Sequence, residues 1–211
     1  MSLRKLIAQC CVLVAALLPL AQASAQQAPD VLVREVTNEV LEIVRADEAL
    51  RAGEKHRVME LVDAKVLPHF DFRRMTMLAV GRDWRDASAE QQVRLTEAFR
   101  TLLVRTYSNA LTQYRDQTVA FRPAHFAATD KRVQVRTEVH QSGAQPIGID
   151  YMLEQSEAGW KVFDVIVEGV SYVQTFRSQF DAPLRQKSIP QVAADLRAGS
   201  ISPGTDADGA R

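Results

Sequence analysis

The chain has 211 residues, of which 46% are hydrophobic and 25% are charged, with 26 basic and 26 acidic side chains. This length suits one globular domain, or one domain with a small helical annex. The balanced charge argues against a nucleic-acid partner, because affinity for nucleic acid rests on clustered Lys and Arg side chains against phosphates.

The N-terminus has the three parts of a secretory signal peptide. Arg4 and Lys5 form a positively charged region, residues 6–20 form a short apolar region, and Ala-Ser-Ala at residues 23–25 forms an A-x-A cleavage site. We therefore expect residues 1–25 to be removed on export, so that the mature chain begins near Gln26.

Cleavage would change the composition of the mature chain. It would remove both cysteines, Cys10 and Cys11, and leave neither a thiol nor a disulfide. It would also remove two of the 26 basic side chains and no acid, which leaves 24 basic against 26 acidic side chains. No later apolar segment is long enough to span a bilayer, so we expect an exported, soluble protein that relies on its hydrophobic core.

Apolar residues at helical spacing mark the first half of the mature chain. Ser88 and Gln91 have the spacing of a capping box, which begins the longest helix. The apolar stripe of that helix is wider than a single packing seam. Helices are predicted over about residues 30–46, 57–66, 70–80 and 88–114.

The apolar period changes to two after Gln117. Residues 132–139 and 147–154 alternate between apolar and polar side chains, and a third strand begins at Trp160. Residues 119–121 allow one more strand at the start. Two helices, about residues 171–185 and 190–197, then follow the strands. This order predicts an α+β fold, with an antiparallel sheet of three or four strands covered by several helices, chiefly those that begin at Ser88 and Ser171.

Residues 160–180 form the most apolar part of this pattern. The strand is apolar at nearly every position up to Val167, Gly169 breaks it, and Ser171 begins a helix. The strand and the helix thus present two apolar surfaces at an angle that Gly169 sets. These surfaces either pack on each other as core or line a cavity.

No convincing catalytic or metal-binding set follows from the sequence. His69 and Asp71 would point about 200° apart on a helix, so a turn histidine and an N-cap aspartate explain them better than an acid–base pair. Asp150 and Asp164 alternate with apolar neighbours and should face away from an apolar cavity. The tyrosines could line a cavity or belong to the core. We expect neither a metal ion nor a cofactor.

Three separated motifs resemble the MlaC family, also called the toluene-tolerance family of periplasmic phospholipid-binding proteins. Residues 81–91, GRDWRDASAEQ, resemble its LGR-x-W-R-x-x-S-x-E-Q segment, and residues 99–111 continue the match. Residues 160–180, with WKVFDV, EGVS and FRSQF, are similar to its C-terminal signature. The similarity runs from about residue 30 to residue 196. One departure is Val80, where the family pattern has leucine.

The resemblance implies a carrier in the periplasm of a Gram-negative bacterium. Such carriers hold the acyl chains of a phospholipid inside the protein and its head group outside. They exchange the lipid with an inner-membrane ABC transporter complex and with an outer-membrane lipoprotein–porin complex, which maintains outer-membrane lipid asymmetry. The implied domain covers residues 26–198, around an apolar lipid pocket, and residues 199–211 form a polar, disordered tail.

The side of the helix or strand on which a residue lies, and its position in the family motifs, together predict which side chains contact the lipid. They are Leu95, Phe99, Leu103, Tyr107, Leu111, Ile149, Tyr151, Leu153, Val165, Val167, Val170, Val173 and Phe176. Two other hypotheses stay open. One is an exported enzyme with a cone-shaped pocket for a small hydrophobic molecule, which would need an acid beside Tyr107 or Tyr151. The other is a structural module whose apolar faces pack only on each other.

Overall fold

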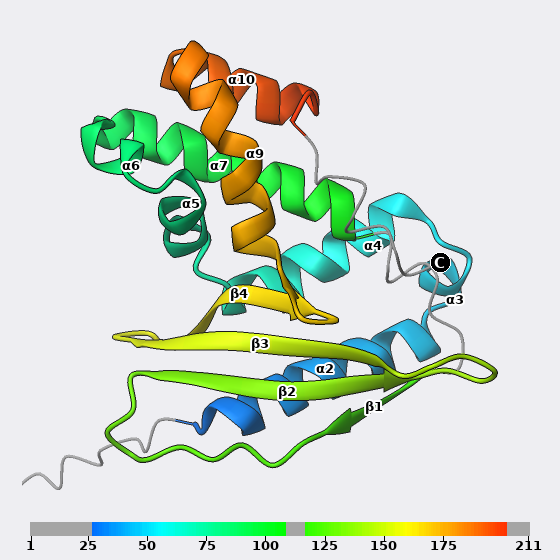
Figure 1. Ribbon diagram of the computed structural model, residues 1–211. Helices are drawn as coiled ribbons and strands as arrows, with labels where there is room; N and C mark the ends of the chain where they lie inside the picture. Colours follow the sequence, from blue (N-terminus) through cyan, green and yellow to red (C-terminus); the bar gives the residue numbers. More distant parts are fainter. Residues whose placement is uncertain (1–26, 109–116, 202–211) are drawn as a thin grey trace, which may run out of the picture.

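A computed structural model describes residues 27–108 and 117–201 (Figure 1). The helices are α2 (Pro29–Ala46), α3 (Glu48–Arg51), α4 (Lys55–Leu61), α5 (Phe72–Val80), α6 (Asp83–Asp86), α7 (Ala89–Tyr107), α9 (Tyr172–Gln186) and α10 (Ile189–Ala198), with a π-helix η1 (Val62–Val66) and a 3₁₀-helix η2 (Leu67–His69). The strands are β1 (Thr118–Phe121), β2 (Arg132–His140), β3 (Ile147–Ser156), β4 (Gly159–Val167) and β5 (Val170–Ser171). The predicted α+β class is confirmed.

The five strands form one antiparallel sheet in the order β1-β2-β3-β4-β5. Val135 on β2 lies opposite Tyr151 on β3, which lies opposite Val165 on β4, so these three side chains share one face. The register shifts at Met152 and Leu153, where Phe163 on β4 is the additional residue of a bulge. The bulge turns Phe163 towards the helices above the sheet.

The fifth strand extends the predicted meander. Glu168 and Gly169 form a two-residue turn between β4 and β5, with φ of 49° and 81°. Positive φ at both central positions is typical of a type I′ hairpin. Gly169 therefore turns the chain back along β4 before α9 begins, and does not join strand directly to helix as the sequence predicted.

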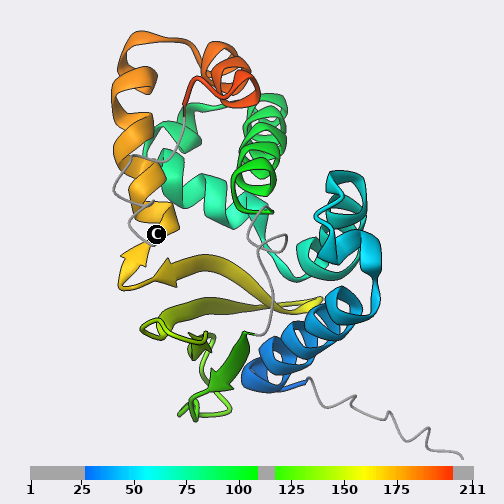
Figure 2. The same cartoon turned by 90° about the vertical axis from the view of Figure 1, so that its right-hand side faces the viewer.

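The helices form two groups around the sheet (Figures 1 and 2). Helix α2 runs alongside one sheet face, where Val33 packs with Val133 and Trp160. Helices α5, α7, α9 and α10 form a bundle above the β4 edge (Figure 2). Of the two helices predicted to cover the sheet, α9 does pack against β4, where Phe163 joins the cluster of Val173 and Phe176. The prediction did not name α2, which covers the opposite face.

The helix ends follow the predicted chemistry. Ser88 and Gln91 make both hydrogen bonds of a capping box at α7. The Asp71 carboxylate accepts from the Arg74 amide at the start of α5, which confirms Asp71 as an N-cap. The Ser171 hydroxyl caps α9 by accepting from the Gln174 amide.

The second predicted helix changes type along its length. It is α-helical only to Leu61, continues as η1 through Val66 and tightens into η2 before Phe70. Single π turns inside helices are rare and occur often at functional sites. Here this irregular segment connects the α2–α4 layer to β4, where the Asp71 amide donates to the Val162 carbonyl over 2.8 Å.

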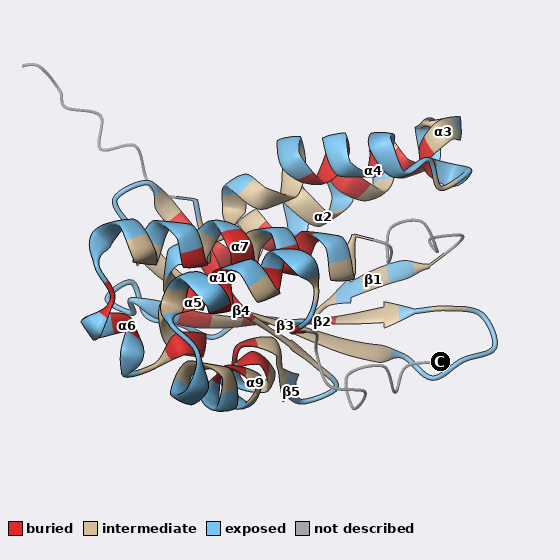
Figure 3. Ribbon diagram, turned by 90° about the horizontal axis from the view of Figure 1, so that it is seen from above, coloured by how far each residue is buried: buried red, intermediate tan, exposed pale blue. Residues whose placement is uncertain are grey.

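The largest buried cluster lies where the bundle helices meet, as the buried residues in Figure 3 show. The Phe99 ring meets Phe176 and Phe180 edge-on, with ring centroids 4.9 and 5.4 Å apart. A second cluster joins α2, α4 and α7 around Val44 and Val58, and a third joins α2 to the sheet. The core is thus divided into three regions, which matters for the site.

The two ends of the chain lie partly outside the described residues. The predicted signal peptide and residues 202–211 of the predicted tail lie outside the described residues. Ile201 is buried against the bundle, so the packed region reaches slightly past the predicted boundary at residue 198. Within the described part of the chain, no helix has the length and apolar character needed to cross a membrane.

Candidate functional site

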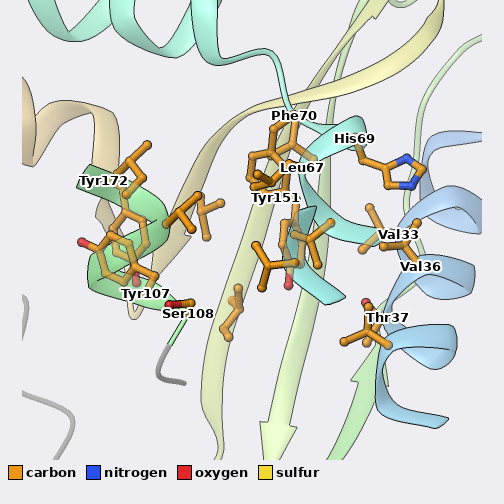
Figure 4. Close-up of a pocket in the computed structure, with 18 of the residues that line it drawn as sticks. Val33, Val36, Thr37, Leu67, His69, Phe70, Tyr107, Ser108, Tyr151 and Tyr172 are labelled. Atoms are coloured by element: carbon orange, nitrogen blue, oxygen red, sulfur yellow. The ribbon is translucent and has the colours of Figure 1, made fainter. Parts of the chain in front are cut away.

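A cavity of about 360 Å³ lies where the three core regions adjoin (Figure 4). Its walls come from α2, η1, η2, α5, the last turn of α7, the inner face of β3 and β4, and the first residue of α9. The lining residues are Leu32, Val33, Val36, Thr37, Val40, Leu41, Val62, Val66, Leu67, His69, Phe70, Phe72, Met75, Leu103, Val104, Tyr107, Ser108, Ile149, Tyr151, Val162, Val165, Val167 and Tyr172.

The cavity wall is almost entirely apolar. Among the described lining residues there is no Asp, Glu, Lys or Arg, and the polar groups are hydroxyls and the His69 imidazole. An unpaired charge would be costly to bury in such a wall, whereas aliphatic chains gain free energy there. The cavity is therefore suited to a long apolar ligand.

Two stacked tyrosines form one end of the cavity. The rings of Tyr107, at the end of α7, and Tyr172, at the start of α9, lie 4.2 Å apart between centroids and 13° from parallel. Figure 4 shows them beside Ser108 and across the pocket from Val33 and Val36. The Tyr107 hydroxyl is buried, and no group in the described part of the chain gives it a hydrogen bond of normal geometry.

All three cavity tyrosines hold their protons strongly. Burial raises the pKa of Tyr107, and the neighbouring Tyr172 phenol raises it further. Burial also raises the pKa of Tyr172. Burial, with a smaller effect of Tyr172, raises the pKa of Tyr151 to about 12. These hydroxyls stay neutral near pH 7, so they can donate hydrogen bonds to a ligand but are poorly suited to act as bases.

His69 is the one described lining residue, apart from the tyrosines, whose side chain is ionisable. Burial and the nearby positive charge of Lys161 lower its pKa, and Glu39 opposes the shift. The imidazole lies on the α2 side of the pocket (Figure 4). With its pKa lowered, His69 is neutral at pH 7, and it adds no charge to the wall.

The structure divides the predicted lipid-contact residues into two groups. One group lines the cavity and comprises Leu103, Tyr107, Ile149, Tyr151, Val165 and Val167. They lie on the last turn of α7 and on the face of β3 and β4 that is turned to α2. The four strand residues share one sheet face, as the alternation of apolar and polar residues predicts for β3. Their contact with a lipid remains a prediction.

The other predicted residues lie elsewhere. Leu95, Phe99, Val173 and Phe176 pack inside the bundle, and Leu153 packs between α2 and the sheet. Val170, on β5, is 44% exposed and is absent from the cavity wall. Leu111 lies outside the described residues.

Sequence reasoning missed the α2 and η1 walls of the cavity. Val33, Val36 and Val40 follow one side of the first helix, and this pattern predicts only a packed helix face. Val66 and Leu67 precede Pro68 and gave no separate signal. A possible indicator was the number of apolar stripes in the chain, which exceeds what one sheet face can cover.

Asp150 and Asp164 lie on the sheet face away from the cavity. Asp164 sits on the sheet face away from the cavity, where its carboxylate accepts from the Ser171 hydroxyl at 2.5 Å and the Val173 amide at 3.1 Å. Asp150 accepts from the Gln134 amide group at 2.7 Å on that same outer face. Both carboxylates therefore lie on the sheet face opposite the Tyr151 side chain. The residues that the structure describes also form no cluster of three or more metal-binding side chains.

The chain is similar to proteins of one known family. The family described as "MlaC protein" matches residues 34–198. Toluene tolerance protein ttg2D of Pseudomonas putida is 34% identical over 119 residues, which cover 56% of this chain and 55% of that protein. The chain thus matches about half the length of that relative.

Two further proteins match more of the chain. The intermembrane phospholipid transport system binding protein MlaC of Haemophilus influenzae is 20% identical over 184 residues, with 86% of each chain covered. The solved structure of a phospholipid-binding protein from Ralstonia solanacearum, in complex with a phospholipid, is 36% identical with a TM-score of 0.75. That match covers 82% of this chain and 98% of the other.

Proposed function

Because this chain belongs to the MlaC protein family, we propose that it binds a phospholipid and carries it through the periplasm. The observation that carries the proposal is the cavity, whose described walls are mostly apolar and contain no Asp, Glu, Lys or Arg. The Ralstonia solanacearum protein, which is similar over most of this chain, was solved with a phospholipid bound.

The free energies of lipid transfer suit a carrier. Two acyl chains hold about 30 methylenes, and burying them away from water is worth on the order of 25 kcal/mol at about 0.8 kcal/mol each. The alternative environment for the lipid is a bilayer, which is equally apolar, so the net preference between protein and membrane is small. A partner complex can therefore load or unload the carrier, while escape of the lipid into water is negligible.

The proposed route follows from the family. The carrier accepts or delivers lipid at an inner-membrane ABC transporter complex and at an outer-membrane lipoprotein–porin complex. It thereby maintains lipid asymmetry of the outer membrane. The predicted signal peptide supports export to the periplasm. No catalytic step is part of this role.

The acyl chains should contact the residues that line the cavity. Ile149, Val165 and Val167 form the sheet wall, and Leu103 with Tyr107 forms the α7 wall. To these we add the α2 wall, represented by Val33 and Val36. The residues buried in the bundle are proposed to support this wall without touching the ligand.

The experiment is to purify the exported protein and analyse it by native mass spectrometry and lipid extraction. We expect one phospholipid mass above the mass of the chain, and transfer of labelled phospholipid between vesicles when the protein is added. A protein that carries no phospholipid after purification and moves none between vesicles would contradict the proposed function.

A further inference from the structure

A second crevice adjoins the apolar cavity. It has a volume of about 390 Å³ and lies between α4 and α7. Val104 and Ser108 line both spaces, so the two spaces share part of their walls. The crevice is thus the immediate neighbour of the cavity at the end formed by the last turn of α7.

The crevice differs from the cavity in its charge. Lys55, Arg100 and Arg105 line it together with one acid, Asp63. The described wall of the main cavity has no cation at all. A phosphate would have to lose its hydration without compensation in the main cavity, whereas Lys and Arg side chains in the crevice are its usual protein partners.

The available partners of these cations decide how strongly the crevice attracts an anion. Arg100 pairs with Asp63 at 2.9 Å and more weakly with Glu97 at 3.9 Å. Arg105 donates to the Arg197 carbonyl at 3.1 Å, a neutral acceptor, and no carboxylate in the described part of the chain forms an ion pair with it.

Lys55 is the least engaged of the three cations. Its side-chain ammonium has no hydrogen-bond or ion-pair partner within residues 27–108 and 117–201. Three cations against the single lining acid leave the crevice with an excess of positive charge.

Among the described lining residues, Lys and Arg lie on one side of the two spaces. Towards α2 the cavity wall is mostly aliphatic, as at Val33 and Val36, and its polar groups there are the Thr37 hydroxyl and the neutral His69 imidazole (Figure 4). Towards α7 the cavity ends at the hydroxyl-bearing residues Tyr107 and Ser108, and Ser108 also lines the cationic crevice. The cations therefore lie beside the end of the cavity that is opposite α2, where the phosphate of a lipid would lie if its acyl chains filled the cavity.

We propose that the α4–α7 crevice binds the phosphate of the carried lipid, with Lys55, Arg100 and Arg105 as its cationic partners. This inference rests on the proposed function, and it fixes the orientation of the lipid: the head group lies at the α4–α7 side and the acyl chains point towards α2. Ser108 then lies beside the ester region.

The test compares two lipids with identical acyl chains. Phosphatidylglycerol carries the phosphate, and diacylglycerol lacks it. Each is labelled, placed in vesicles of neutral carrier lipid at low salt, and its equilibrium uptake by the protein is measured. The variants are Lys55→Gln, Arg100→Gln and the double variant. The control is Arg94→Gln, which removes another exposed α7 arginine that pairs with a carboxylate, at 2.6 Å from Glu90.

We expect each single variant to lower phosphatidylglycerol uptake about two- to fivefold, and the double variant about fivefold or more, as expected for exposed ion pairs. Diacylglycerol uptake should not change, and Arg94→Gln should behave as wild type. Raising the salt concentration should reduce the difference, because these charges are partly exposed. Thermal unfolding of each variant checks that the fold is intact.

Three results would overturn the inference. One is an unchanged phosphatidylglycerol uptake in the double variant. Another is an equal loss for both lipids, which would mean that the crevice only supports the cavity. The third is binding of inorganic phosphate at the crevice that loaded lipid does not displace, which would assign the site to a free anion. A wild-type protein that takes up neither lipid would instead contradict the proposed function itself.

Discussion

A carboxyl group placed on the cavity wall gives a quantitative test of whether acyl chains occupy it. Val165 is the best position, because its side chain faces the cavity from β4 and is only half-buried. In the empty protein the carboxylate of Val165→Glu can be hydrated by water in the cavity. In the loaded protein it would meet acyl chains and would have to be neutral.

The expected loss of lipid affinity equals the free energy needed to protonate the new carboxylate. Protonating a Glu of ordinary pKa, about 4.3, costs about 3.7 kcal/mol at pH 7 and about 1 kcal/mol at pH 5, at about 1.36 kcal/mol per pH unit. This free energy is subtracted from the binding free energy of the lipid, because the pKa of the carboxyl is raised only in the loaded state. Lipid affinity should therefore fall several hundredfold at pH 7 and recover about a hundredfold on acidification to pH 5.

The assay is equilibrium uptake of labelled phospholipid from vesicles at pH 5, 6 and 7, with thermal unfolding to verify the fold. Val165→Gln is the matched control, since it is polar and similar in size but does not titrate, so its uptake should be independent of pH. The reasoning is refuted if Val165→Glu takes up lipid as wild type does at pH 7. It is also refuted if the variant loses uptake equally at all three pH values.

Three further predictions concern stability and are checked by denaturant unfolding. Phe176→Ala should lower the free energy of unfolding by about 3–5 kcal/mol, because this ring is fully buried against Phe99; a loss below 1 kcal/mol would contradict its assignment to the core. Tyr107→Phe should be neutral or stabilise by up to about 1 kcal/mol, because it removes a buried hydroxyl without a good partner; a clear destabilisation would show that the hydroxyl is satisfied. Burial raises the pKa of Asp164, so the folded state holds this proton more tightly than the unfolded chain does, and stability should fall as pH rises from about 4 through the raised pKa. Asp164→Asn should flatten that part of the profile, and an unchanged profile would contradict the shift.

Much of the fold could be predicted from local patterns. The Ser88 capping box, the Asp71 cap and the alternation of β2 and β3 each depend on interactions within a few residues, and each was confirmed. The helix that covers the sheet could not be identified in this way. Its position depends on long-range packing of Val33 against Trp160, for which a single sequence has no local signal.

The cavity was predicted less well than the fold for a related reason. Periodicity identifies an apolar face, but it does not tell whether another element closes over that face. Phe99 and Leu103 lie on the same side of α7, yet Phe99 is closed off by Phe176 and Phe180. Leu103, one turn further along, reaches the cavity. Helix α9 contacts α7 through Phe176 and Phe180 at Phe99 and through Tyr172 at Tyr107. Leu103 lies between these two contacts along α7 and so faces the cavity.

The division of the core explains why the cavity stays open without collapsing. Each wall is the outer edge of a cluster that is already packed: Leu103 belongs to the bundle, Val104 to the α2–α4–α7 cluster, and Val162 to the sheet cluster. Closing the cavity would require one of these clusters to shift as a whole and to lose its own contacts, which are worth more than the edge residues would gain. A bound acyl chain contacts the edge residues of all three clusters while each cluster keeps its own packing. The acyl chain thus fills the space between the three parts of the core. Since the ligand binds only this folded arrangement, loading should raise the unfolding temperature in proportion to the logarithm of free lipid concentration.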